Sequence, residues 1–307
     1  MKTLLRFFIF YFGFTTLIFA QGLPVTSPEN VGLSSERFKR LETVMTQYLE
    51  KKQIAGAVAL VVRKGKVAYF KSIGMQEVEM KKPMQDNTIF RIASMTKPIT
   101  SVAVMMLYEE GRFLLNDPIH KYLPEFKDMM VLNPERATNG HAKADSLVPA
   151  KRPITIRHLL SHTSGLTYHW NDRLGEPYKK AGIAHGLGLH NETLAANMKK
   201  LAKLPLLFHP GARILSRKSV ELMTADFADD LNPNNGFGLG FGIRRTLPEG
   251  GELGSVGAYG WSGFWNTQFL IDPREQMISL VFTQLYPYAA VDLMDKFTVM
   301  VYQAVSD

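Results

Sequence analysis

The chain has 307 residues, 46% of them hydrophobic and 21% charged, which allows one large domain with a sizeable core and excludes a disordered or collagen-like chain. It has no cysteine, which excludes a thiol nucleophile and a thiolate metal site. The formal net charge is +8, but the basic residues are scattered, which argues against a nucleic-acid-binding stripe.

The first twenty residues have the pattern of a secretory signal peptide. Two basic residues precede the apolar run Phe7–Phe19, and Ala20 offers a small residue for cleavage. The run is short for a membrane span, and an uncleaved anchor is the alternative. We therefore expect residues 1–20 to be removed and residues 21–307 to form one domain, periplasmic or secreted, with no membrane span of its own.

The N-terminal half of this domain predicts a helix and a hairpin. Ser34 or Ser35 caps a helix whose apolar residues recur at helical spacing as far as Leu49. A β-rich run over Ala55–Val62 then turns at Lys-Gly-Lys into a second run over Val67–Phe70. This pattern predicts an antiparallel hairpin with both strands largely buried.

A long helix is expected from Ser94 to Glu110, where Gly111 ends it. Pro98 falls near the first turn, where proline is tolerated. The helix is apolar nearly all round, which is typical of a helix buried on all sides.

The middle of the chain predicts short elements joined by long loops. Residues 129–153 are polar and rich in turn residues, so we expect a surface loop. Short helices are expected over Ile156–His162 and Glu192–Leu204, with a glycine-rich, mobile segment over 171–190 between them.

The end of the chain is β-rich again. Three strands are expected, over Gly236–Arg245, Trp265–Ile271 and Met277–Gln284, followed by a helix over Val291–Val305. Glycine alternates along the first of them, which predicts a strand packed closely on one face. Strands from both chain ends must share one antiparallel sheet flanked by helices, which is an α+β fold.

The sequence Ser94-Met95-Thr96-Lys97 is a Ser-x-x-Lys motif. On a helix, residues three apart share a face, so Lys97 can reach the Ser94 hydroxyl. A serine is a poor nucleophile unless a base takes its proton, and backbone N–H groups at a helix start can hold an oxyanion. Alone the motif is weak, and an N-cap serine with a solvated lysine is the alternative.

Three stretches give the chain a resemblance to the serine β-lactamase-like family, which includes class C β-lactamases, penicillin-binding proteins, carboxylesterases and non-catalytic relatives. They are Phe90–Lys97, Pro153–Leu166 and Gly260–Gly263, the last running on towards Ile271-Asp272-Pro273. The resemblance implies a β-lactamase/transpeptidase-like fold that needs no metal or organic cofactor. It also implies that Ser94 is the acylated nucleophile and Lys97 its proton partner.

Trp261-Ser262-Gly263 falls where β-lactamases of this family have Lys-Thr-Gly. The resemblance implies that a strand there lines the site and that a backbone N–H beside Gly263 completes the oxyanion hole. A lysine at this position would bind the carboxylate of a β-lactam, so its absence favours neutral esters or amides. The alternative for Trp261 is a core aromatic at the start of a strand.

The second motif of the family, Tyr-x-Asn, is missing where it is expected. It normally follows a His-Pro-Gly stretch, here His209–Gly211, but the residues after Gly211 resemble a stretch that in relatives lies roughly a hundred residues further on. We therefore expect an interior deletion near residue 212 and a truncated helical lobe around 112–235. Tyr168 and Tyr259 are the candidate stand-ins for the missing base.

Two histidines suggest a different chemistry. His158 and His162 are four residues apart, as metal ligands on one helix face are, but no acidic third ligand is evident. The resemblance implies instead that His162 is a structural turn residue, so we expect no metal site.

Three functional hypotheses remain. The first is a secreted serine hydrolase that acts on a small ester, amide or β-lactam-like substrate through an acyl-enzyme. The second is a non-catalytic relative that binds peptidoglycan-like or peptide ligands. The third is a damaged form of an active enzyme.

Overall fold

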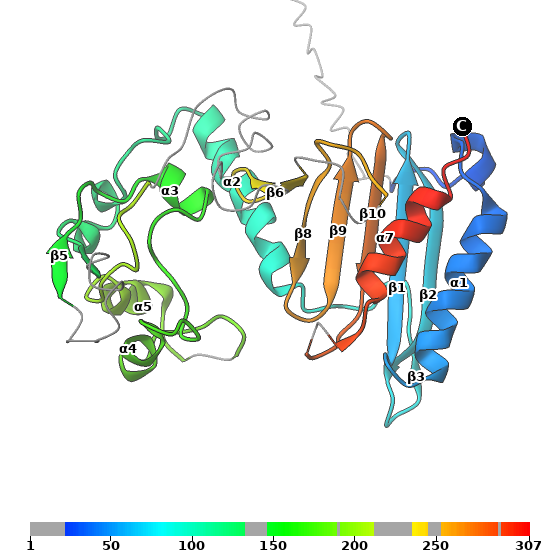
Figure 1. Ribbon diagram of the computed structural model, residues 1–307, viewed down its shortest axis with the longest axis horizontal. Coiled ribbons are helices and arrows are strands. Elements are labelled where there is room, and N and C mark those ends of the chain that lie inside the picture. The colour runs from blue at the N-terminus through cyan, green and yellow to red at the C-terminus, as the bar shows by residue number, and fades with distance from the viewer. Residues whose placement is uncertain (1–21, 133–145, 189–190, 212–234, 245–252, 288–289) are drawn as a thin grey trace, which may run out of the picture.

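The computed structural model describes residues 22–132, 146–188, 191–211, 235–244, 253–287 and 290–307. These residues form a sheet lobe and a helical lobe, with one long helix between them (Figure 1). The expected signal peptide and the expected deletion near residue 212 both lie outside the described residues.

Strands from both ends of the chain form one antiparallel sheet, as the sequence predicted. Within the described residues the sheet has eight strands in the order β3-β2-β1-β10-β9-β8-β7-β6. Its central pairing joins the two halves of the chain, with Val61 of β1 opposite Ser279 of β10. The strands are β1 (Gly56–Arg63), β2 (Lys66–Glu77), β3 (Lys82–Pro83), β6 (Asn235–Phe237), β7 (Gly242–Arg244), β8 (Tyr259–Gly263), β9 (Thr267–Asp272) and β10 (Met277–Phe282).

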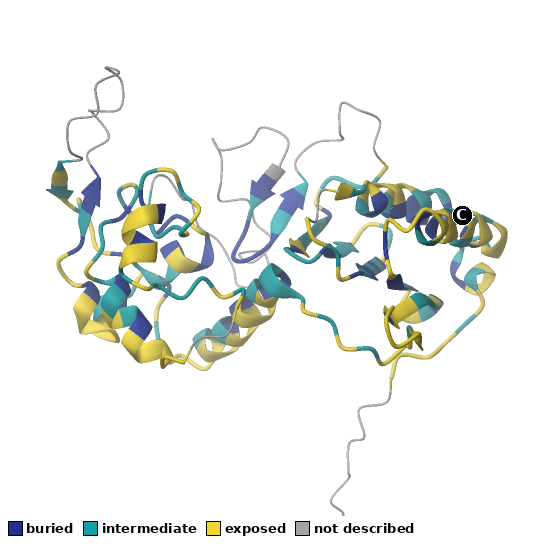
Figure 2. Ribbon diagram, turned by 90° about the horizontal axis from the view of Figure 1, so that it is seen from below, coloured by how far each residue is buried: buried dark blue, intermediate teal, exposed yellow. Residues whose placement is uncertain are grey.

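Two helices, α1 (Ser35–Glu50) and α7 (Leu293–Gln303), pack against each other on one face of the sheet (Figure 1). The Ser34 hydroxyl caps α1 by accepting a hydrogen bond from the Arg37 N–H. Both helices are amphipathic, and Figure 2 shows buried and exposed residues alternating along the helices of the molecule. The helices and the sheet enclose an apolar core that includes Leu41, Met45, Val61, Val281, Phe297 and Val301.

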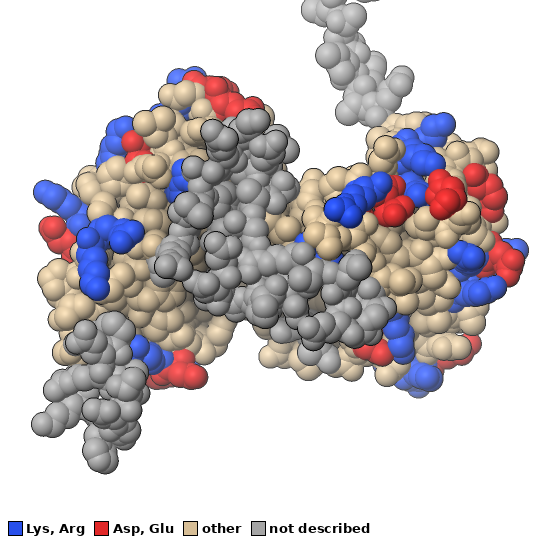
Figure 3. Space-filling model, turned by 45° about the horizontal axis from the view of Figure 1, so that its top comes forward, with Lys and Arg blue, Asp and Glu red and all other residues tan. Residues whose placement is uncertain are grey.

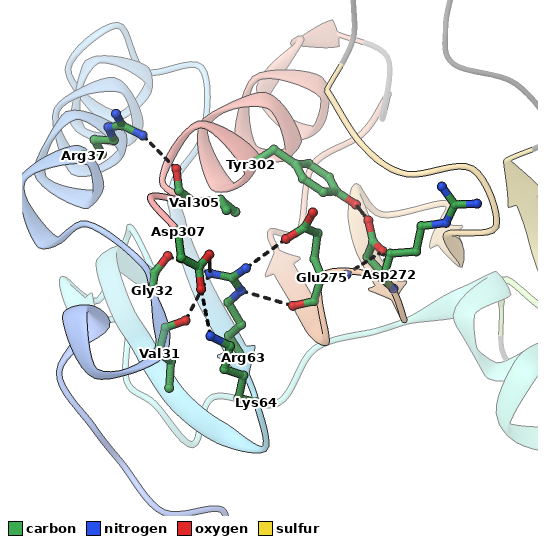
Figure 4. A network of polar contacts seen from close by, with 11 residues as sticks. Val31, Gly32, Arg37, Arg63, Lys64, Asp272, Glu275, Tyr302, Val305 and Asp307 are labelled. Atoms are coloured by element: carbon green, nitrogen blue, oxygen red, sulfur yellow. Dashed lines mark hydrogen bonds and ion pairs between the residues drawn. The ribbon is translucent and has the colours of Figure 1, made fainter.

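The buried guanidinium of Arg63 ties the chain ends to this core (Figure 4). It pairs with the carboxylates of Glu275 at 2.9 Å and Asp307 at 2.7 Å. It also donates to the backbone carbonyls of Val31 and Gly32. A buried charge is costly unless it is fully paired, so this cluster holds the end of β1, the β9–β10 turn and both flanking segments in one arrangement.

We expect Arg63→Ala to lower the free energy of unfolding by about 2 kcal/mol, because two carboxylates and three backbone carbonyls lose a donor at once. Urea denaturation of the purified chain measures this. The control is Arg40→Ala, whose ion pair with Glu36 is exposed and so contributes well under about 1 kcal/mol. Equal effects of the two substitutions would contradict a structural role for the Arg63 cluster.

The helical lobe has its own core. Its buried residues include Phe126, Ile154, Leu174, Tyr178 and Leu206. Its elements are α3 (Ile156–Leu160), α4 (Gly175–Lys180), α5 (Leu194–Leu201), the strands β4 (Met130–Leu132) and β5 (Leu147–Pro149), and the short 3-10 turns η3 (Ile119–Lys121) and η4 (Pro124–Phe126).

Two predictions for this lobe were incomplete. The segment 129–153, expected to be a loop, contains the paired strands β4 and β5. The segment 171–190, expected to be mobile, contains α4, because Leu174 and Tyr178 are both buried in the lobe core and fix the helix there.

The long helix α2 (Thr96–Glu109) contradicts the prediction that it is buried on all sides. Pro98, Ser101 and Met105 are buried against the β6–β7 turn and a small apolar cluster. The core of the helical lobe is built around Phe126 and Tyr178 instead, so it leaves the opposite face of α2 uncovered. That face exposes Ile99, Val102, Met106 and Leu107, with exposed fractions of 60%, 44%, 60% and 48%.

Adjacent methionines on α2 therefore differ in their contribution to stability. We expect Met105→Ala to lower the free energy of unfolding by about 2–4 kcal/mol, since it leaves a cavity in a packed cluster. Met106→Ala should change it by less than about 0.5 kcal/mol, because this side chain is exposed. Thermal and urea denaturation of the two variants provide the comparison, and a large loss for Met106→Ala would show that its face is covered in solution.

The expected single strand over Gly236–Arg245 is instead the hairpin of β6 and β7, with Arg245 outside the described residues. Gly240 has φ +90° in the turn, and a side chain there would collide with Ser101 of α2. The alternating glycines therefore reflect a turn and its close approach to α2, not a flat strand.

No helix in the described residues has the length and hydrophobicity that a membrane span needs. On the face shown in Figure 3, basic and acidic side chains lie close together over both lobes, without gathering by sign.

Candidate active site

The Ser-x-x-Lys motif lies where the long helix begins. A 3-10 turn, η2 (Ala93–Met95), leads directly into α2. The Nζ of Lys97 donates a hydrogen bond of 2.8 Å to the Oγ of Ser94. Both side chains are half-buried, so the predicted contact forms in a partly enclosed place.

The backbone just before Ser94 is in an unusual conformation. Ala93 has φ +43°, in the left-handed region that a residue with a side chain rarely adopts. Such conformations cost of order 1–3 kcal/mol and cluster at functional sites, where they aim a side chain. Here the strained residue directly precedes the serine and sets its direction.

Strand β8 places the third predicted motif beside this turn, since β8 and η2 are in direct contact. A side chain at Gly263 would collide with the carbonyl of Ile92, two residues before Ser94. Gly263 therefore lets the end of β8 approach the serine closely. The structure thus brings the end of β8, with Gly263, next to the turn that carries Ser94, and Trp261 and Ser262 precede Gly263 on the same strand.

Three aromatic rings line a cavity of about 510 Å³ beside β8. The ring centroids of His162 and Phe237 are 4.5 Å apart. The Trp261 ring stands edge-on to both, with its centroid 6.0 Å from that of His162 and 5.1 Å from that of Phe237. Ile243 and Phe269 extend the apolar lining. The cavity walls share Trp261 and Ser262 with the third predicted motif, and Arg244 and Gln268 add polar groups to a lining that is otherwise largely apolar.

His162 was expected only as a turn residue, and it does occupy a strained turn position, with φ +57°. It also faces the site. Loss of surrounding water, and to a smaller extent the charge of Lys97, lower the pKa of His162 to about 4, although its side chain still reaches the open cavity. At neutral pH it therefore presents an uncharged imidazole. The sequence signal for its position at the site was its place in the stretch Ser161–Gly165, which belongs to the family resemblance.

His158 has a different role and does not join His162 in a cluster. Its Nδ1 accepts a hydrogen bond from the Thr155 N–H, while the Thr155 hydroxyl accepts from the His158 N–H, which together cap α3. Gly211 packs against its ring. Among the described residues, no group of three or more His, Asp or Glu side chains is arranged to hold a metal ion.

The two candidate stand-in tyrosines lie in different surroundings. The Nζ of Lys97 lies over the ring of Tyr168, 5.8 Å from its centroid. Tyr259 packs edge-on against Phe241, next to the cluster that holds Met105. Burial raises the pKa of Tyr259, which disfavours the phenolate that a base requires. The geometry therefore connects Tyr168, and not Tyr259, to the Ser94–Lys97 pair.

Neutral His162 predicts a pH dependence of stability. Its pKa is about 4 in the folded chain against 6.5 for an unperturbed histidine, so the unfolded chain binds more protons between these values. Stability should therefore fall as the pH drops from 6.5 towards 4. We expect His162→Gln to flatten this slope in melting temperature, measured by circular dichroism. Because burial also lowers the pKa of His158, part of the slope should persist in the variant. A slope that His162→Gln leaves unchanged would contradict the lowered pKa of His162.

Comparison with known proteins agrees with this geometry. A family model described as Beta-lactamase matches residues 41–220, more than half of the chain. Esterase EstB of Burkholderia gladioli is 38% identical over 173 residues, which are 56% of this chain and 40% of that protein. Protein Rv1367c of Mycobacterium tuberculosis is 36% identical over 172 residues, 55% of this chain and again 40% of that protein. The chain thus spans about two fifths of the length of these curated relatives.

Solved structures share the fold at lower identity. EstCE1, a hydrolase with promiscuous acyltransferase activity, has a TM-score of 0.72 at 19% identity and covers 88% of this chain and 98% of its own. Simvastatin synthase (LovD) from Aspergillus terreus has a TM-score of 0.68, also at 19% identity, with the same coverage.

Proposed function

Because the chain belongs to the β-lactamase family, among whose members are esterases, we propose that it is a serine hydrolase that cleaves a small ester or amide through an acyl-enzyme at Ser94. The observation that carries this proposal is the 2.8 Å hydrogen bond between Lys97 Nζ and Ser94 Oγ at the start of α2. It supplies a nucleophile and a proton partner within reach of each other.

In the proposed reaction, Oγ of Ser94 attacks the carbonyl carbon while the Lys97 amine takes the hydroxyl proton. Backbone N–H groups at Ser94 and beside Gly263 hold the negative oxygen of the tetrahedral intermediate. Lys97 then gives the proton to the leaving oxygen or nitrogen as its bond to carbon breaks. Water attacks the acyl-enzyme in the same way, which releases the acid and restores Ser94.

The tyrosine that the family uses as a base has no counterpart at the predicted sequence position. We propose that Lys97 itself carries the proton, with the ring of Tyr168 beside it. The face of an aromatic ring stabilises a cation within about 6 Å, so Tyr168 favours the ammonium that Lys97 becomes when it takes the proton. Tyr168 thus supports the step through its ring face.

The surroundings of the pair favour an uncharged substrate. Trp261 occupies the position where β-lactamases have lysine, so this position offers no cation for a substrate carboxylate. The adjoining cavity is lined by Phe237, Trp261 and Ile243, by His162, which is neutral at pH 7, and by Arg244, whose guanidinium donates to the Leu253 carbonyl. Esters and amides with apolar substituents therefore fit better than penicillins. The signal-peptide pattern of residues 1–20 supports action in the periplasm or outside the cell.

The second candidate function is ligand binding without turnover. It is favoured by the sequence after Gly211, which lacks the Tyr-x-Asn motif. The same cleft would then hold peptidoglycan-like or peptide ligands, with Ser94 as a polar contact.

Labelling of Ser94 decides between the two functions. We expect residues 21–307 to react with a fluorophosphonate and to hydrolyse 4-nitrophenyl butyrate, with mass spectrometry locating the label on Ser94. Ser94→Ala should abolish both reactions, and Lys97→Ala should slow hydrolysis by about 10²–10⁴-fold, as loss of a general base does. A chain that is folded by circular dichroism but neither labels nor turns over would leave ligand binding as its function.

A further inference from the structure

An exposed aromatic stack lies beside the proposed nucleophile. The rings of Tyr168 and Trp170 are nearly parallel, with an interplanar angle of 9° and centroids 4.4 Å apart. Although they cover each other, 40% of Tyr168 and 53% of Trp170 remain exposed. Large exposed aromatic surface is costly in water, so a flat aromatic pair at a site entrance is a surface suited to a ligand.

The stack is held in a defined position. The Asn171 N–H donates to the Tyr168 carbonyl and closes the turn that carries both rings. The Asn171 side chain accepts from the N–H groups of Arg173 and Leu174, and Leu174 is buried in the lobe core. A side chain at Gly175 would collide with the carbonyl of His169, so the start of α4 packs closely beneath the turn. The rings are therefore presented by fixed backbone.

Lys97 connects this stack to the chemistry. Its Nζ contacts Ser94 Oγ at 2.8 Å and lies over the Tyr168 ring at 5.8 Å. In the proposed reaction the leaving group must lie next to the group that returns the proton to it, which is Lys97. The leaving group therefore departs on the side of Tyr168, on whose ring Trp170 stacks.

We propose that Tyr168 and Trp170 form the leaving-group subsite and that it prefers esters of alcohols that carry a planar aromatic ring. This inference rests on the proposed function and adds the class of alcohol that the site accepts. Aromatic pairs contribute about 0.5–1.5 kcal/mol beyond the area they bury, so the ring of the alcohol gains a contact that a saturated ring of similar size does not. The cavity beside Trp261 remains for the acyl group.

Hydrolysis of two matched esters tests this subsite. Benzyl acetate and cyclohexylmethyl acetate have leaving alcohols of similar size, and only the first carries a planar ring. We expect the wild-type chain to prefer benzyl acetate in KM, and Trp170→Ala to reduce that preference by about 2–10-fold, the equivalent of one lost aromatic contact. Trp170→Phe should retain most of it. Phe70→Ala removes an exposed aromatic from β2 of the sheet lobe and should leave the preference unchanged.

A second pair of esters, in which the ring is moved from the alcohol to the acyl group, tests which side of the ester the stack contacts. With methyl phenylacetate and methyl cyclohexylacetate the ring belongs to the acyl group, and Trp170→Ala should not change their ratio. A change confined to this second pair would overturn the leaving-group assignment. An unchanged ratio for both pairs would overturn the subsite itself.

Binding to the Ser94→Ala chain separates this inference from the proposed function. This variant cannot form an acyl-enzyme, and saturation-transfer NMR measures its affinity for the two acetates directly. We expect tighter binding of benzyl acetate, lost in Ser94→Ala combined with Trp170→Ala. If the wild-type chain fails to label at Ser94 but this preference holds, hydrolysis fails and the aromatic subsite stands. If labelling succeeds and Ser94→Ala binds both esters equally, the subsite fails alone.

Discussion

The pairing of β1 with β10 is the constraint on which the rest of the site depends. It joins segments separated by more than two hundred residues, and the register then runs from β10 through β9 to β8. That register decides where β8 ends and brings Gly263 against the carbonyl of Ile92. The serine and the third motif meet because the two ends of the chain share one sheet.

Features that depend on local spacing could be predicted from the sequence. The i, i+3 spacing of Ser94 and Lys97 predicts their contact, and the serine before α1 predicts its cap. Features that depend on residues distant in the sequence could not be predicted in this way. The apolar face of α2 was predicted to be buried, but burial depends on which residues the helical lobe places against it. The glycines at 236–242 have the same alternation in a strand as in the observed hairpin, and only Ser101 distinguishes the two.

The choice between the two candidate tyrosines likewise depends on residues that are distant in the sequence. Both are aromatic residues near a motif, and sequence separation does not tell which one faces Lys97. Tyr259 alternates on β8 with Trp261, yet its ring is turned into the cluster around Phe241. Tyr168 lies in a turn fixed by Asn171, which brings its ring under the Nζ of Lys97. His162 was underestimated for the converse reason, since its turn position also places it in the wall of the cavity.

The two lobes contribute different parts of the site. Helix α2 is anchored on its sheet-lobe side, where Pro98 and Ser101 pack against the turn at Gly240 and Met105 packs with Phe241. Strand β8 and the β6–β7 turn hold the start of α2, while Leu160 of α3 joins Met105 in the apolar cluster further along the helix. The helical lobe supplies His162 and the Tyr168–Trp170 stack, which in the proposed reaction contact the substrate. Change in the helical lobe should therefore alter which ester is accepted before it disturbs the nucleophile, because the strained turn at Ala93 is held by β8.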